Sequence, residues 1–186
     1  MEIDKFVVRN ILKTLVEYAV IILFGLGIVY LDEIEFSGIE IKYLIVLLAG
    51  TKSIYFFIKG FRKISELSVM DLKYYEFLVF IAVNISVIIV SFGLDFFCLY
   101  RVDPASFSGL PSGAAVFGLL FKFFYFSLMI FTNIGIIKII PESTEAEVAV
   151  IFEAILSFIT IIFVLSDFLS LKESLGRRRS DSKNSD

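Results

Sequence analysis

Residues 124–167 read FYFSLMIFTNIGIIKIIPESTEAEVAVIFEAILSFITIIFVLSD, and this stretch decides the fold. An apolar helical run is followed by a non-helical piece at Gly135, a stop at Pro141, an acidic loop and a second long apolar helix. The first run extends back to residue 117 and so has about 15 residues, whereas a helix that crosses a bilayer needs about 20. We therefore predict a helix that enters the membrane and turns back. Backbone groups left unpaired after such a helix must be buried in protein or line a water-filled path.

Residues 132–141 align without gaps with a known filter pattern. They read TNIGIIKIIP and resemble the T-T-V-G-Y-G-D-I-V-P pattern of the tetrameric potassium-channel family. The YFS at 125–127 resembles that family's pore helix, and FEAILS at 152–157 is similar to the start of its inner helix. The resemblance implies an outer helix, a pore helix, a filter and an inner helix, repeated in a homotetramer.

In that family, backbone carbonyls of four subunits replace the hydration shell of the ion. The resemblance therefore implies passive flow of monovalent cations past the carbonyls of residues 132–135, with the Thr132 hydroxyl at the cavity end. It assigns the filter to Thr132, Asn133, Ile134, Gly135, Ile136, Ile137 and Lys138.

Three of the departures from the family pattern bear on the function of the filter. Gly135 keeps the first glycine, which reaches positive φ freely, but the second is replaced by Ile137, for which positive φ is an outlier. Ile136 lacks the tyrosine hydroxyl of the pattern, and Lys138 replaces an acid, so four lysines at the outer mouth would disfavour cation entry. We expect an ion channel that is not strictly potassium-selective. The alternative is a non-conducting membrane scaffold or regulatory subunit that keeps the channel fold.

The composition indicates an integral membrane protein, because hydrophobic residues make up 58% of the chain and the mean hydropathy is +0.90. With Cys98 as the single cysteine and no histidine, an internal disulfide and a structural zinc site are excluded. The absence of histidine also removes the commonest general base. We expect no enzyme, no cofactor, no nucleic-acid partner and no metal beyond permeant cations.

Four spans are predicted, at residues 11–31, 42–58, 75–100 and 146–171. Basic residues follow the second and fourth spans, whereas the loop after the first span is acidic. The positive-inside rule therefore places both termini in the cytoplasm. The predicted fold is an all-α protein of the cell membrane, with a re-entrant pore helix and filter loop between the third and fourth transmembrane helices.

The chain divides into three parts on this interpretation. Residues 1–73 form an N-terminal two-span region with a cytoplasmic linker, residues 74–172 form the pore domain, and residues 173–186 form a basic polar tail. The tail is expected to attract anionic membrane lipids and is a candidate site for a cytoplasmic partner. The loop at 101–113 is rich in Pro, Ser and Gly and is predicted to be an exposed connection. A small transporter would need internal repeats, which the sequence lacks.

Several polar side chains fall inside predicted spans. Lys52 must snorkel or pair, and Glu17 on the neighbouring span is the expected partner. Voltage sensing by Lys52 is disfavoured because sensing helices carry denser arginine runs. Glu17 can instead pair with Lys13 one helical turn away. Asn84 is expected to bond a neighbouring helix, and Asp95 is expected to contact the pore-helix region.

A polar stripe runs along the last span. Its members are spaced alternately four and three residues apart, which places them on one helical face. In a tetramer they are candidates for lining the cavity. They are Glu153, Ser157, Thr160, Val164 and Asp167. For Glu153, the alternative is that its carboxylate turns sideways and bonds the pore helix.

Overall fold

The computed structural model describes residues 16, 19, 38–69, 74–111, 113, 115–135 and 138–183. The first predicted span, with Lys13 and Glu17, lies outside the described residues apart from Val16 and Ala19, which are helical. The described elements are the helices α2 (Gly38–Val69), α3 (Tyr74–Val102), α4 (Val116–Phe131) and α5 (Thr144–Lys183), the 3-10 turn η1 (Pro104–Ser106) and the strands β1 (Phe107–Ser108) and β2 (Ile140–Pro141).

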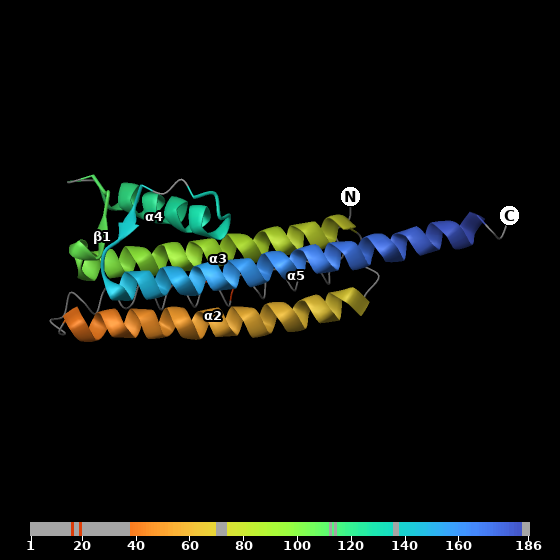
Figure 1. The fold of residues 1–186 in the computed structure, drawn as a ribbon, viewed down its shortest axis with the longest axis horizontal. Coiled ribbons are helices and arrows are strands. Elements are labelled where there is room, and N and C mark those ends of the chain that lie inside the picture. The colour runs from red at the N-terminus through yellow and green to blue at the C-terminus, as the bar shows by residue number, and fades with distance from the viewer. Residues whose placement is uncertain are drawn as a thin grey trace.

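Three long helices, α2, α3 and α5, pack against one another along the length of the molecule, and α4 lies over one end of this bundle (Figure 1). Within the described residues, α3 and α5 each contain a segment long and apolar enough to cross a membrane, namely Ile81–Val102 and Thr144–Ser166. The prediction of a helical chain with membrane-crossing helices is confirmed at this level.

The start of α5 has favourable capping chemistry. The Ser143 hydroxyl oxygen accepts a hydrogen bond from the Ala146 N–H at 3.2 Å, and Glu145 and Glu147 stand in the first turn, where the helix dipole favours negative charge. The helix then continues to Lys183, well beyond the predicted span end. Residues 172–183 contain no proline, and most of them are compatible with helix.

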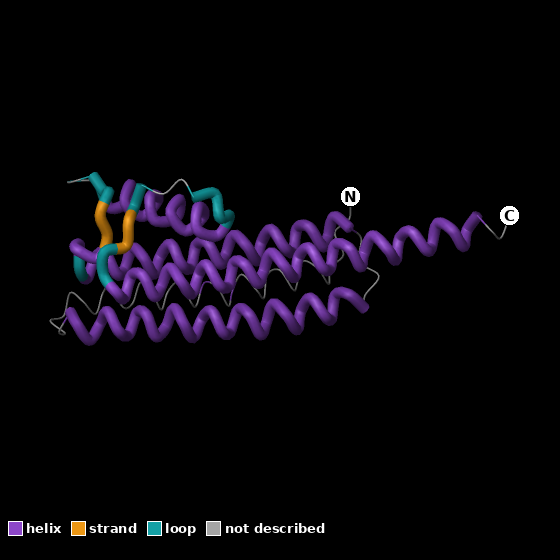
Figure 2. The backbone as a smooth tube through the Cα atoms, in the orientation of Figure 1, coloured by secondary structure: helices purple, strands orange, loops and turns teal. Residues whose placement is uncertain are grey.

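The α4 helix is shorter than a membrane-crossing helix, and its re-entry into a membrane stays a prediction. It has 16 residues, which is about 24 Å of helix against a hydrocarbon core of about 30 Å. The chain before α4 and the chain after it meet again in an antiparallel pair, with Phe107 opposite Pro141 and Ser108 opposite Ile140. The polypeptide therefore enters and leaves the α4 region at the same end of the bundle (Figure 2).

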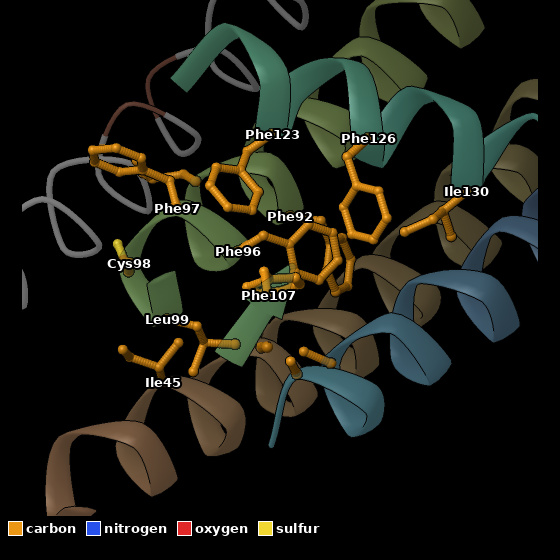
Figure 3. Packing of buried hydrophobic residues seen from close by; sticks show 14 of the residues in the cluster. Ile45, Phe92, Phe96, Phe97, Cys98, Leu99, Phe107, Phe123, Phe126 and Ile130 are labelled. Atoms are coloured by element: carbon orange, nitrogen blue, oxygen red, sulfur yellow. The ribbon is translucent and has the colours of Figure 1, made fainter. Parts of the chain in front are cut away.

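An aromatic cluster fixes α4 to α3. Phe107 from β1 packs against two rings of α4 (Figure 3). Its ring centroid lies 5.2 Å from that of Phe123 and 5.9 Å from that of Phe126. The ring centroid of Phe96 of α3 lies 5.2 Å from that of Phe126. Edge-on contacts at these distances are favourable aromatic geometry. Most described residues of the loop at 101–113 are exposed or half-buried, as predicted for a connection, but Phe107 is only 4% exposed. One aromatic side chain anchors this loop in the core.

Candidate functional site

The candidate site is the turn that follows α4. The helix ends where the Thr132 N–H bonds the Leu128 carbonyl at 3.0 Å and the Asn133 N–H bonds the Ile130 carbonyl at 3.1 Å. The Thr132 hydroxyl also donates to the Leu128 carbonyl, at 2.7 Å. Because that bond uses the hydroxyl proton, the lone pairs of the Thr132 oxygen remain able to accept or to face a cation.

The backbone turns through left-handed conformations immediately after the helix. Asn133 has φ +53° and Gly135 has φ +76°. Asparagine is among the few residues that tolerate this region, and glycine reaches it freely, as expected for Gly135. Residues 132–135 and Lys138 are exposed on the single chain, whereas Ile136 and Ile137 lie outside the described residues.

The chain beyond the turn is held by the loop that precedes α4. An added Cβ at Gly109, where φ is +80°, would lie 1.9 Å from the Lys138 carbonyl oxygen. The Ser108 hydroxyl donates to the Glu142 carboxylate at 2.5 Å, and the Glu142 N–H bonds the Ser106 carbonyl at 2.9 Å. Both ends of the turn are therefore fixed, one by α4 and the other by this loop.

Two residues of the predicted polar stripe lie beneath α4. Glu153 and Ser157 are fully buried. The Glu153 carboxylate contacts the Ser127 hydroxyl of α4, and the Ser157 hydroxyl donates to the Phe131 carbonyl at 2.5 Å. Their side chains thus bond α4 and are not free to line a cavity, because the close packing of α4 on α5 covers this part of the stripe. For Glu153, the alternative prediction holds, because its carboxyl group turns sideways and contacts α4 at Ser127.

The remaining stripe residues differ from these two. The Thr160 hydroxyl donates to the Leu156 carbonyl of its own helix at 2.7 Å, and both Thr160 and Val164 are half-buried. The side chain of Asp167 lies outside the described residues.

Lys52 of α2 is paired with α3. Its ammonium nitrogen lies 2.5 and 2.6 Å from the two carboxylate oxygens of Asp95 and 3.1 Å from the Ser91 hydroxyl. All three ammonium donors are therefore used. The expectation that Lys52 pairs is confirmed, and its partner among the described residues is Asp95. Glu17, the partner suggested by the sequence, lies outside the described residues. Depth along a span cannot distinguish between two acidic residues on different neighbouring helices.

A second ion pair joins the N-terminal part of α2 to the residue that follows α3. Lys42 of α2 bonds the Asp103 carboxylate, which also accepts a hydrogen bond from the Ala105 N–H at 3.0 Å. The Lys42 hydrogen bond is the main cause that holds the pKa of Asp103 below its ordinary value. Among the described residues, no group of three or more Asp, Glu, Cys or His side chains could hold a metal ion.

Comparisons with protein-family models, curated proteins and solved structures find no match. The function must therefore be argued from the geometry of this chain. The sequence identified the turn itself. It missed the hydroxyl groups of Ser91 and Ser127 that contact the buried side chains of Lys52 and Glu153, although small polar residues within apolar helices are known to bond neighbouring helices.

Proposed function

We propose that the chain is one subunit of a tetrameric, potassium-channel-like ion channel with a non-standard filter. The observation that carries the proposal is the short helix α4 followed by an exposed turn with left-handed residues at Asn133 and Gly135. A membrane protein tolerates exposed irregular backbone at depth only where it lines a water-filled path. One chain supplies one such turn, so a closed path needs further copies around an axis.

Outward-facing apolar surfaces support assembly in a membrane. On α4 and α5, large side chains recur at helical spacing and remain exposed on the single chain. They are Phe117, Phe121, Tyr125 and Leu128 on α4, and Ile151, Ile155, Phe158, Ile162 and Leu165 on α5. Such continuous apolar faces are covered by lipid or by other subunits. The proposal assigns the surfaces nearest the turn to contacts between copies and the others to lipid.

The proposed path uses backbone carbonyls of residues 132–135 and the Thr132 hydroxyl oxygen. The cation is monovalent, because carbonyl dipoles without carboxylates replace the hydration shell of weakly hydrated ions. Lys138 is exposed just beyond the turn, and four copies of its ammonium would lower the cation concentration at the mouth. The channel is therefore weakly conducting and not strictly selective for potassium, and in this orientation both termini are cytoplasmic.

The test is ion flux into liposomes that contain the purified chain, measured separately with potassium, sodium and chloride gradients. Cation flux is expected, lost in Gly135→Asp and increased in Lys138→Asp. Lys122→Asp is the matched control, because Lys122 is also an exposed lysine but lies on α4. An equal increase in Lys122→Asp would mean that general surface charge, and not the mouth of the pore, controls the flux.

The second candidate is a non-conducting scaffold or regulatory subunit. It is favoured by the two ion pairs that attach α2 to α3 and to the residue after it, because they make α2 a fixed part of the fold. A tetrameric protein that passes no ion in either charge variant would support this candidate and reject the channel.

A further inference from the structure

Glu153 is a buried carboxyl group with an unusual set of contacts. It is 0% exposed on α5, in the region where α4 packs on α3 and α5. Its Oε1 contacts the Ser127 hydroxyl, and its Oε2 is buried with no hydrogen-bond partner among the described residues. An ionised carboxylate in this position would have half of its charge unpaired in an apolar interior, which is very costly.

The number of hydrogens at Ser127 determines which group can donate. The Ser127 oxygen lies 2.9 Å from the Ile89 carbonyl of α3 and also contacts Glu153. A hydroxyl has one hydrogen, and a carbonyl oxygen can only accept. If Ser127 donates to Ile89, the contact between Ser127 and Glu153 needs a hydrogen on Glu153. An ionised Glu153 would instead accept the single hydrogen of the Ser127 hydroxyl. The Ser127 oxygen and the Ile89 carbonyl oxygen would then face each other with no hydrogen between them.

Within the part of the chain that the structure describes, the charged neighbours do not supply a counter-ion. On α3, the charge of Asp95 acts on Glu153 and is negative. On α2, Lys52 has all three donors engaged by Asp95 and Ser91. The described part of α4 contributes Lys122 and Tyr125 as titratable groups, and both are exposed. On α5 itself, Glu147 is exposed and negative.

We propose that Glu153 is a proton-binding site, occupied in the folded protein at neutral pH. The carboxylic acid donates from Oε1 to the Ser127 oxygen, and Ser127 donates in turn to the Ile89 carbonyl. One proton thereby connects α5, α4 and α3 in a single chain of hydrogen bonds. Release of the proton to hydroxide in the solvent leaves a buried carboxylate that competes for the Ser127 hydrogen and breaks the bond from α4 to α3.

The proposal does not depend on ion conduction, because it concerns only the protonation of the folded chain. A glutamate in the unfolded chain is ionised above about pH 4.3, so folding at neutral pH takes up one proton. The folded state then binds more protons than the unfolded state, and stability falls as pH rises. The ratio of folded to unfolded protein is expected to decrease by about tenfold per pH unit from this group.

Infrared spectroscopy of the full chain in liposomes tests the protonation directly. The difference spectrum between wild type and Glu153→Gln at neutral pH is expected to contain the carbonyl stretch of a protonated carboxylic acid, shifted in deuterium oxide. The matched control is Asp95→Asn, whose difference spectrum is expected to contain only bands of an ionised carboxylate, because Asp95 is paired with Lys52. Carboxylate bands alone in the Glu153→Gln spectrum would overturn the proposal.

A second variant covers the case in which Glu153→Gln does not fold. Ser127→Ala removes the acceptor of the proposed bond and is expected to shift the same acid band to higher frequency. Absence of any protonated acid band from the wild-type protein at neutral pH would overturn the proposal without any variant. Where Glu153→Gln folds, its amide can still donate to Ser127, so its melting temperature is expected to lose the pH dependence described above.

Discussion

At the scale of single residues, the contact between Gly109 and the Lys138 carbonyl leaves no space for a side chain. Gly109→Ala is expected to be strongly destabilising, because the new Cβ would lie 1.9 Å from that oxygen. Gly113→Ala is the control, since Gly113 has a similar φ of +76° but nothing within 4 Å of an added Cβ. The control should cost only the backbone penalty of about 1–2 kcal/mol. Thermal unfolding in detergent measures both, and equal losses would contradict the steric argument.

The buried pair of Lys52 and Asp95 gives a second prediction at this scale. Lys52→Met alone and Asp95→Asn alone each remove one partner of the pair. Lys52→Met leaves the Asp95 carboxylate buried without its counter-ion, and the expected loss in the free energy of unfolding is about 3–5 kcal/mol. The double variant should recover most of the stability lost in Lys52→Met, because no unpaired charge remains. Chemical unfolding of the four proteins gives the coupling energy. Additive losses would show that the two side chains act independently.

At the scale of secondary-structure elements, the Ser157 hydroxyl connects α5 to the last residue of α4. Ser157→Ala leaves the buried Phe131 carbonyl without this donor, and the expected loss of stability is about 1–3 kcal/mol. Thr160→Val on the same helix is the control, because the Thr160 hydroxyl bonds only its own helix. Thermal unfolding compares the two, and a larger loss in Thr160→Val would contradict the role of Ser157.

The contact between α2 and the end of α3 is expected to depend on pH. The pKa of Asp103 is held below its ordinary value of 3.8 by its hydrogen bond from Lys42. Folding therefore favours the ionised form of Asp103. The stability that this carboxylate contributes is present above its unfolded-state pKa of about 3.8 and is lost as pH falls through its lower folded-state pKa. Wild type should melt at a higher temperature than Asp103→Asn at neutral pH, and the difference should shrink below about pH 3.8. A difference in melting temperature that does not change with pH would exclude the ionisation of Asp103 as its cause.

At the scale of the whole molecule, the exposed apolar faces of α4 and α5 are expected to be covered by other copies of the chain and by lipid. Native mass spectrometry of the detergent-purified chain should give the mass of four copies. Phe158→Asn places an amide in the exposed face of α5 and should shift the population towards single chains, because polar groups in a packed membrane interface need partners. Ser166→Asn on the same helix is the control, since Ser166 is exposed and already polar. A single-chain mass for wild type would reject the tetramer.

The sequence predicted the local features of this fold closely. The predicted pore helix at 117–131 and the observed α4 differ by one residue, because apolar length and the following Asn133 to Gly135 turn are both local properties. The Ser143 cap is equally local, since a cap depends on residues within one turn. By contrast, Phe107 was not recognised as a core residue, because its burial depends on Phe123 and Phe126 elsewhere in the chain.

By itself, the sequence determined where the helices lie, which one is too short to cross a membrane, and where the backbone must turn after it. Each of these follows from apolar length, glycine, proline and capping residues that act over a few positions. Only the tertiary structure decided that Lys52 pairs with Asp95 and that Glu153 contacts Ser127. The physical reason is that a buried charge needs a partner at contact distance, and the choice among candidates depends on the rotation and register of packed helices.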